Sequence, residues 1–71
     1  MTNLLLKYAL LPLVRMRAET EMPELKDEWW VLGHVAENIA GQVHAESVNL
    51  QNTEDVIEAI DDVLMRWSDQ A

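Results

Sequence analysis

The sequence predicts an all-α fold, a small three-helix bundle in which residues 1–71 form a single domain. Apolar residues recur every three or four positions over 28–46 and 53–68, which is the period of an amphipathic helix rather than of a strand. An apolar run over 3–18 supplies a third helix, and Pro23 separates it from the second. A chain of 71 residues has room for one small core.

The first helix is expected over 3–18, buried, with a break at Pro12. Proline lacks a backbone donor and disfavours helical geometry in the residue before it, so the helix should bend or stop there. Lys7 interrupts the apolar run, and Arg15 and Arg17 follow it, so neither a secretory signal nor a membrane span of about 20 residues fits. A helix lying on an anionic membrane surface, with these three bases facing lipid, is the alternative.

The second helix is expected over 28–46, where apolar pairs repeat with a four-residue spacing: Val31 and Leu32, Val35 and Ala36, Ile39 and Ala40. Gly33 and Gly41 lie inside this segment, and each weakens a helix by about 1 kcal/mol relative to alanine. The alternative is an α+β fold, ββα with an amino-terminal helix, in which 29–35 and 43–50 are strands.

The third helix, over 53–68, has the clearest pattern. Asn52 is placed to cap it, because its side-chain oxygen can accept a hydrogen bond from a first-turn amide, and Thr53 could serve instead one residue later. Glu54 and Asp55 follow at the end where the helix dipole stabilises negative charge. Its apolar residues join those of the other helices in an expected core: Leu5, Leu10, Leu13, Trp29, Leu32, Val35, Ile39, Val43, Val56, Ile60, Val63, Leu64 and Trp67.

The opposite arc of the third helix is acidic, with Met65 in its middle and six carboxylates around it: Glu54, Asp55, Glu58, Asp61, Asp62 and Asp69. One interpretation is a solvated face that keeps a small domain soluble. The other is a contact surface for a basic protein, with Met65 as an adaptable apolar anchor. Trp30 lies off the apolar stripe of the second helix and offers another anchor, unless the first helix or a second copy covers it.

The spacing of these carboxylates bears on what such a partner would be. Along a helix with a rise of about 1.5 Å per residue, they give one charge per roughly 4 Å. A single DNA strand carries one phosphate per about 3.4 Å, and a duplex twice as many. The acidic face therefore has the charge spacing of one strand, and DNA mimicry is one interpretation of it.

Composition and motifs exclude several classes of function. The net charge of −8 rules out a basic footprint for direct nucleic-acid binding. The absence of cysteine excludes disulfides and thiolate metal sites, and it fits a cytoplasmic protein. His34 and His44 lack the spacing of a helical metal site, and no phosphate-binding loop or nucleophile motif is present. We therefore expect no enzyme, no cofactor and no metal.

The sequence predicts a small acidic, cytoplasmic protein-binding module that occupies a basic, nucleic-acid-binding surface of a larger protein, as phage and plasmid inhibitors do. The expected partner-binding residues are Trp30, Glu54, Glu58, Asp61, Asp62 and Met65. Replacing Glu58, Asp61 and Asp62 by glutamine should slow association and flatten its salt dependence. The alternative is an obligate homo-oligomer, a homodimer or an assembly subunit, because 4–14 is richer in leucine than a small monomer readily buries.

Overall fold

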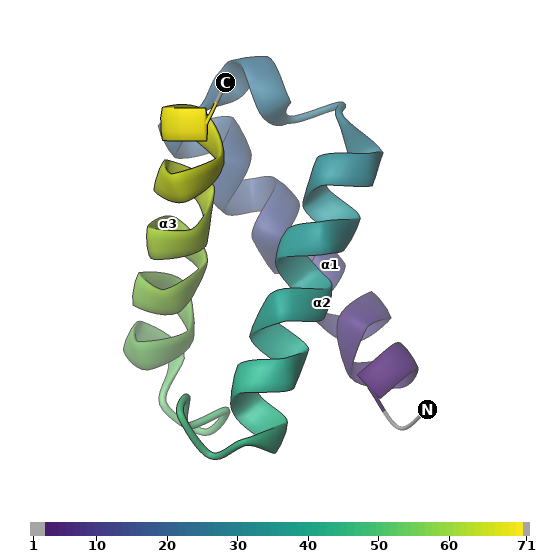
Figure 1. The fold of residues 1–71 in the computed structure, drawn as a ribbon, viewed down its shortest axis with the longest axis vertical. Helices are drawn as coiled ribbons and strands as arrows, with labels where there is room; N and C mark the ends of the chain where they lie inside the picture. Colours follow the sequence, from purple (N-terminus) through teal and green to yellow (C-terminus); the bar gives the residue numbers. More distant parts are fainter. Residues whose placement is uncertain (1–2, 71) are drawn as a thin grey trace.

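The computed structural model describes the backbone of residues 3–70 and the side chains of residues 4–67. The chain forms a three-helix bundle, as predicted, with α1 (Asn3–Glu21), a short 3-10 helix η1 (Pro23–Leu25), α2 (Trp29–His44) and α3 (Thr53–Gln70). Figure 1 shows α2 and α3 as antiparallel neighbours, with α1 crossing behind them. Residues 3–70 contain no strand, so the ββα alternative is wrong.

The predicted break at Pro12 is also wrong, because α1 continues through it as one helix. Pro12 has no N–H to donate to the carbonyl of Tyr8, one turn earlier, and both residues are exposed. Water can hydrate that carbonyl, which makes the proline tolerable on the outer side of the helix. The helix runs to Glu21 rather than 18, and it ends immediately before the segment Met22–Pro23, where proline disfavours further helix.

The core lies where the three helices meet. Leu32, Ile39, Ile60 and Leu64 are completely buried there. The other confirmed core residues are Leu10, Val35, Val56 and Val63, while Leu13, Val43 and Trp67 are partly buried against them. The sequence prediction missed several buried residues, among them Val14, Ala18, Val31, Ala36, Ala40 and Val48.

Two residues assigned to the core are exposed instead. Leu5 is 83% exposed, because α1 turns Leu10, Val14 and Ala18 inward at a four-residue spacing and Leu5 lies on the opposite side. Trp29 is 52% exposed, because it is the first residue of α2 and lies at the end of the bundle. The guanidinium of Arg15 lies 5.8 Å from the centroid of the Trp29 ring, within the range of a cation–π contact.

The connection between α2 and α3 is built from backbone caps. Glu46 has a φ of 62°, and its N–H donates to the Val43 carbonyl while that of Ser47 donates to Gln42, the two bonds of a Schellman motif. The side-chain oxygen of Asn52 then accepts from the Asp55 N–H at 3.3 Å, which confirms the predicted cap of α3. The Schellman motif ends α2, and the Asn52 cap sets the residue at which α3 begins. The start of α3 in turn determines which way its acidic residues face.

Candidate functional site

The acidic face of α3 is the candidate site. Glu54, Glu58 and Asp62 are exposed along it, Asp61 is half-buried, and Met65 is 60% exposed among them. The side chain of Asp69 lies outside the described residues. An apolar side chain is therefore exposed on an otherwise acidic face.

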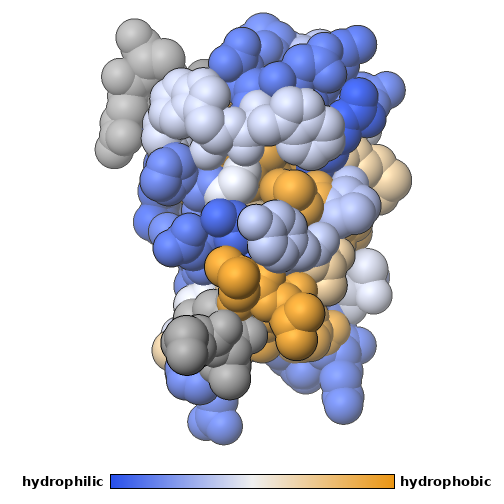
Figure 2. Space-filling view, turned by 90° about the vertical axis from the view of Figure 1, so that its right-hand side faces the viewer, coloured by the Kyte–Doolittle hydropathy of each residue, from blue (hydrophilic) through white to orange (hydrophobic). Residues whose placement is uncertain are grey.

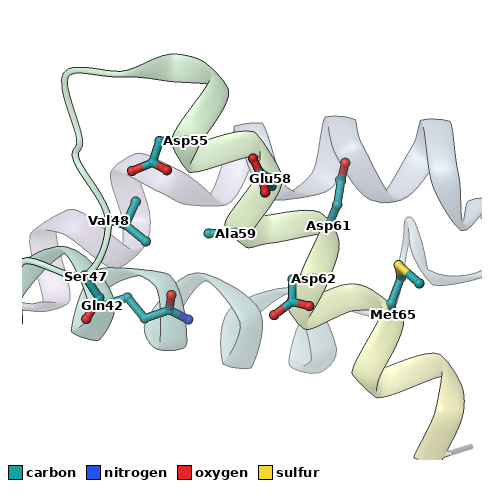
Figure 3. Close-up of a pocket in the computed structure, with 9 residues that line it drawn as sticks. All are labelled: Gln42, Ser47, Val48, Asp55, Glu58, Ala59, Asp61, Asp62 and Met65. Atoms are coloured by element: carbon teal, nitrogen blue, oxygen red, sulfur yellow. The ribbon is translucent and has the colours of Figure 1, made fainter.

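An open groove of about 430 Å³ runs along this face, between α3, the end of α2 and the loop after it. Figure 3 shows carboxylates from successive turns of α3 along the groove. The residues that line it are Gln42, Ser47, Val48, Asp55, Glu58, Ala59, Asp61, Asp62 and Met65. It therefore brings together four of the six predicted partner-binding residues, Glu58, Asp61, Asp62 and Met65, and neither Glu54 nor Trp30 lines it.

A second depression lies on the other side of Met65. Its volume is about 320 Å³, and Glu21, Met22 and Leu64 line it together with Asp61 and Met65. Met65 thus borders both hollows, and a partner side chain on either side of it would contact its thioether. A flexible, polarizable side chain in that position adapts to differently shaped partners.

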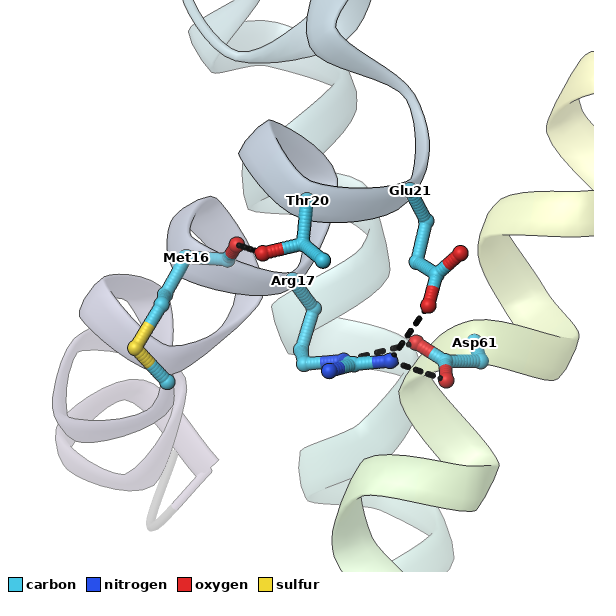
Figure 4. A network of polar contacts seen from close by, with 5 residues as sticks. All are labelled: Met16, Arg17, Thr20, Glu21 and Asp61. Carbon is cyan, nitrogen blue, oxygen red and sulfur yellow. Dashed lines mark hydrogen bonds and ion pairs between the residues drawn. The ribbon is translucent and has the colours of Figure 1, made fainter.

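Arg17 of α1 neutralises Asp61, which the sequence did not predict. Its Nε and a terminal nitrogen donate to the two carboxylate oxygens of Asp61 at 3.0 and 2.7 Å, and the same terminal nitrogen donates to Glu21 at 2.8 Å (Figure 4). The side chains of Arg17 and Asp61 are only 21% and 30% exposed. The hydrogen bond with Asp61 is the main cause that raises the pKa of Arg17 above its ordinary value. Asp61 therefore joins α1 to α3 as well as lining the groove.

Most of the other bases are bound in the same way. Lys7 lies 3.4 Å from Glu37, Arg15 pairs with Glu19 and Asp27, and Arg66 lies 2.8 Å from Asp62. Among the described side chains, four of the five bases are thus in ion pairs, and no base lies within ion-pair distance of Glu54, Asp55 or Glu58. Within the part of α3 whose side chains are described, the uncompensated negative charge is concentrated in the first two turns.

Trp30 belongs to a separate surface. Its ring meets Trp67 of α3 in a T-shaped contact, with centroids 5.5 Å apart, and His34 lies beside both rings. Its Nε1 donates to Glu28 at 3.1 Å, and the residue is 61% exposed. Trp67 and Met65 project from α3 about 160° apart. The structure therefore does not place Trp30 and Met65 on one contact surface.

The described side chains contain no group of three or more histidines, aspartates and glutamates placed to hold a metal ion. No helix within residues 3–70 combines the length and the hydropathy that crossing a bilayer requires. Comparison with protein-family models, with curated proteins and with solved structures finds no match to this chain.

Proposed function

We propose that the protein is a small, non-enzymatic, cytoplasmic binding module that occupies a basic surface of a larger protein. The observation that carries this proposal is the combination of uncompensated carboxylates at Glu54, Asp55 and Glu58 with a groove bordered by the exposed Met65. The carboxylates supply long-range attraction, and Met65 supplies apolar contact once the partner has docked.

The charge balance of the whole chain supports this role. The net charge is −8, and because four of the five bases are already paired with acids, the charge that remains on the described part of α3 is negative. Such a field accelerates encounter with a positive surface and is screened over a Debye length of about 10 Å at 0.1 M salt. Association should therefore be fast at low salt and slower as salt rises.

The ion pairs of α3 also indicate the size of the basic surface that the protein would bind. Asp61 and Asp62 already have basic partners in the chain, so among the described side chains of α3 the uncompensated carboxylates extend from Glu54 to Glu58. At about 1.5 Å per residue this is roughly 6 Å, the length of two phosphate spacings along one DNA strand. The fitting target is a compact cluster of Lys and Arg, such as the phosphate-binding patch of a nucleic-acid enzyme. A phage-like inhibitor that imitates a short stretch of DNA backbone would act in this way.

The first step of the test is to capture the partner. Immobilised protein is exposed to cell lysate, and bound proteins are eluted first with duplex DNA and then with salt. Release of a nucleic-acid-binding protein by DNA supports the proposed competition for a phosphate-binding surface. Release by salt alone would contradict the nucleic-acid part of the proposal.

The second step measures association with the purified partner. The double substitution Glu54→Gln with Glu58→Gln should slow association several-fold and flatten its dependence on salt. The matched control, Glu24→Gln with Glu46→Gln, removes the same charge from exposed positions outside α3 and should have a much smaller effect. Association of the α3 variant at the wild-type rate at every salt concentration would rule out the acidic face. Asp61 is omitted, because its loss would also break the contact with Arg17.

The alternative function, an obligate homo-oligomer or assembly subunit, rests on a different observation. The amino-terminal half of α1 exposes Leu4 and Leu5, and Figure 2 shows hydrophobic surface on the side of the molecule where this part of the chain lies. This face shares no residue with the groove on α3. The two functions are therefore separable by substitution.

A further inference from the structure

The outer side of α1 has an unusual composition. Between residues 4 and 16 of this helix, every exposed residue is apolar or aromatic: Leu4, Leu5, Tyr8, Ala9, Pro12 and Met16. The four large side chains of this set are each more than half exposed. A helix on the surface of a monomer normally turns charged residues to water and apolar residues to the core. A continuous apolar surface of this kind marks an interaction site.

Two of the three bases of α1, Lys7 and Arg17, reach the other helices, and Arg15 lies at one edge of the apolar face, where it is paired with acids. Lys7 reaches Glu37 of α2, Arg15 reaches Asp27, and Arg17 reaches Asp61 of α3. Figure 4 shows Met16 on the opposite side of α1 from the contact between Arg17 and Asp61. All three bases of α1 are thus paired with acids, and no charged residue between 4 and 16 is classed with the exposed apolar residues of its outer face.

We propose that this face binds the same face of a second copy, forming an antiparallel two-fold dimer. The residues at its centre, Leu5, Ala9, Pro12 and Met16, define the α1 stripe, and they are spaced by four, three and four positions. This spacing is unchanged when the direction of the helix is reversed. Two antiparallel stripes place Leu5 against the partner's Met16 and Ala9 against the partner's Pro12, as an isologous contact requires. The small Ala9 near the axis lets the two helices approach closely.

The distribution of charge favours a second copy of the chain, rather than a lipid surface, as the partner of this face. Two copies that each carry −8 repel one another least where no acid lies, and residues 4–16 contain none. An anionic membrane would repel the acidic body of the protein, and the bases that would bind lipid headgroups are held in ion pairs. An uncharged helix face therefore fits a second uncharged helix face.

The area of the face sets the strength of the contact. With its large side chains more than half exposed, it offers roughly 500 Å² per copy, so a dimer would bury about 1,000 Å², near the lower limit for a specific interface. The dimer should therefore dissociate on dilution. Raised salt should preserve or strengthen it, because salt screens the repulsion between the two acidic bodies.

Sedimentation of the full chain over low to high micromolar concentration tests the dimer. The expected mass rises from 8.2 kDa toward twice that value. Leu5→Gln with Met16→Gln should weaken association at least tenfold while circular dichroism stays unchanged, because both residues are exposed. Met65→Gln, an equally exposed site on α3, should dimerise as the wild type does. A monomer at every concentration, or a dimer indifferent to the stripe substitutions, would overturn the proposal.

The register has its own test, because the chain has no natural cysteine. A mixture of the single variants Leu5→Cys and Met16→Cys should form a disulfide-linked heterodimer under mild oxidation. Each variant alone should cross-link poorly, since like positions of antiparallel stripes are separated by 11 residues, or about 16 Å along the helix. Efficient cross-linking of either variant with itself would overturn the antiparallel arrangement. Neither result depends on the groove of α3, so this test and that of the proposed function fail independently.

Discussion

Arg17 and Asp61 are 44 residues apart in the chain, and two hydrogen bonds of 3.0 and 2.7 Å join them across the α1–α3 boundary. A guanidinium that meets a carboxylate through two parallel N–H donors is held in a defined geometry, unlike a lysine on a flexible chain. Glu21 also binds this guanidinium, so the contact orients the end of α1 against the middle of α3. One carboxylate of the acidic face is thus part of the scaffold that supports that face.

Breaking this contact should destabilise the bundle. We expect Asp61→Asn to lower the urea midpoint of unfolding more than Asp62→Asn does, because it leaves a half-buried arginine with an incomplete set of acceptors. The control removes the same charge from an exposed pair with Arg66, which is worth only about 0.3–0.5 kcal/mol. Equal midpoints for the two variants would contradict a structural role for Asp61.

The pH dependence of this contact follows from the raised pKa of Arg17. A raised pKa means that the stabilisation is complete below the unfolded-state pKa and is lost only as pH rises through the folded-state value. Both values lie at strongly alkaline pH. The stability difference between wild type and Arg17→Gln should therefore be the same in neutral and mildly alkaline buffers, as urea titrations at each pH would measure. A difference that declined across that interval would contradict this assignment.

Truncation in the core should unfold a large fraction of the protein. Ile60 is completely buried between the helices, and Ile60→Ala should cost about 2–5 kcal/mol, through lost burial and the cavity left behind. A domain of this size has only a few kcal/mol of net stability. Thermal unfolding followed by circular dichroism should show a broad or missing transition. Met65→Ala, exposed on the same helix, should change stability by less than about 0.5 kcal/mol.

Glu46 offers a stabilising substitution. Its positive φ places a non-glycine residue in left-handed geometry, which costs about 1–2 kcal/mol in residues that have a Cβ. Glu46→Gly should stabilise the fold by about 0.5–1 kcal/mol, the smaller figure reflecting the greater flexibility of glycine in the unfolded chain. Chemical denaturation measures the gain. Glu46→Ala keeps the Cβ and should give no comparable gain; an equal gain would point to the lost charge instead.

Replacing Gly41 should also stabilise the fold. A Cβ built at this position meets nothing within 4 Å, so alanine fits the interior of α2 without displacing a neighbour. Gly41→Ala should stabilise the protein by roughly 1 kcal/mol, the difference in helix propensity. At Gly33 the added methyl would make ordinary contact with Lys7, so a similar gain is expected there. A loss of stability at Gly41 would mean that this surface is covered in solution.

The aromatic contact between α2 and α3 should contribute measurably to stability. T-shaped pairs contribute about 0.5–1.5 kcal/mol beyond the burial of their surface. A double-mutant cycle with Trp30→Ala and Trp67→Ala should return a coupling energy within that range. A coupling energy near zero would mean that Trp30 does not stabilise the fold through Trp67. It would then remain available for binding, the role that the sequence predicted.

Helices and their buried faces were predicted best in segments where polar and apolar residues recur with a clear period. In α3, Val56 and Ile60 lie inward and carboxylates outward, so the period identifies both the helix and its buried face. In α1 almost every residue from 4 to 14 is apolar, and a uniform run contains no period from which to choose the inner side. Leu5 was therefore assigned to the core and lies in solvent.

The candidate site was predictable only in part, for a different reason. The acidic face follows from the helical period of α3 alone. The partners of its carboxylates depend on how the helices cross, and no local pattern links Arg17 to a residue 44 positions away. The same applies to Trp30, because whether it reaches the acidic face or Trp67 is decided by the packing of α2 on α3.

The indole pair also gives the folded chain an optical signature. Trp30 comes from the first turn of α2 and Trp67 from the carboxyl-terminal part of α3, so their rings meet only when the two helices have docked. Fixed edge-to-face geometry makes the environment of each chromophore asymmetric, and the near-ultraviolet circular dichroism of the pair should report that docking directly. Because Trp67 and Met65 project about 160° apart, a protein bound in the groove would leave this signal largely unchanged. The docking of α2 on α3 can then be followed in the presence of a bound partner, without an added label.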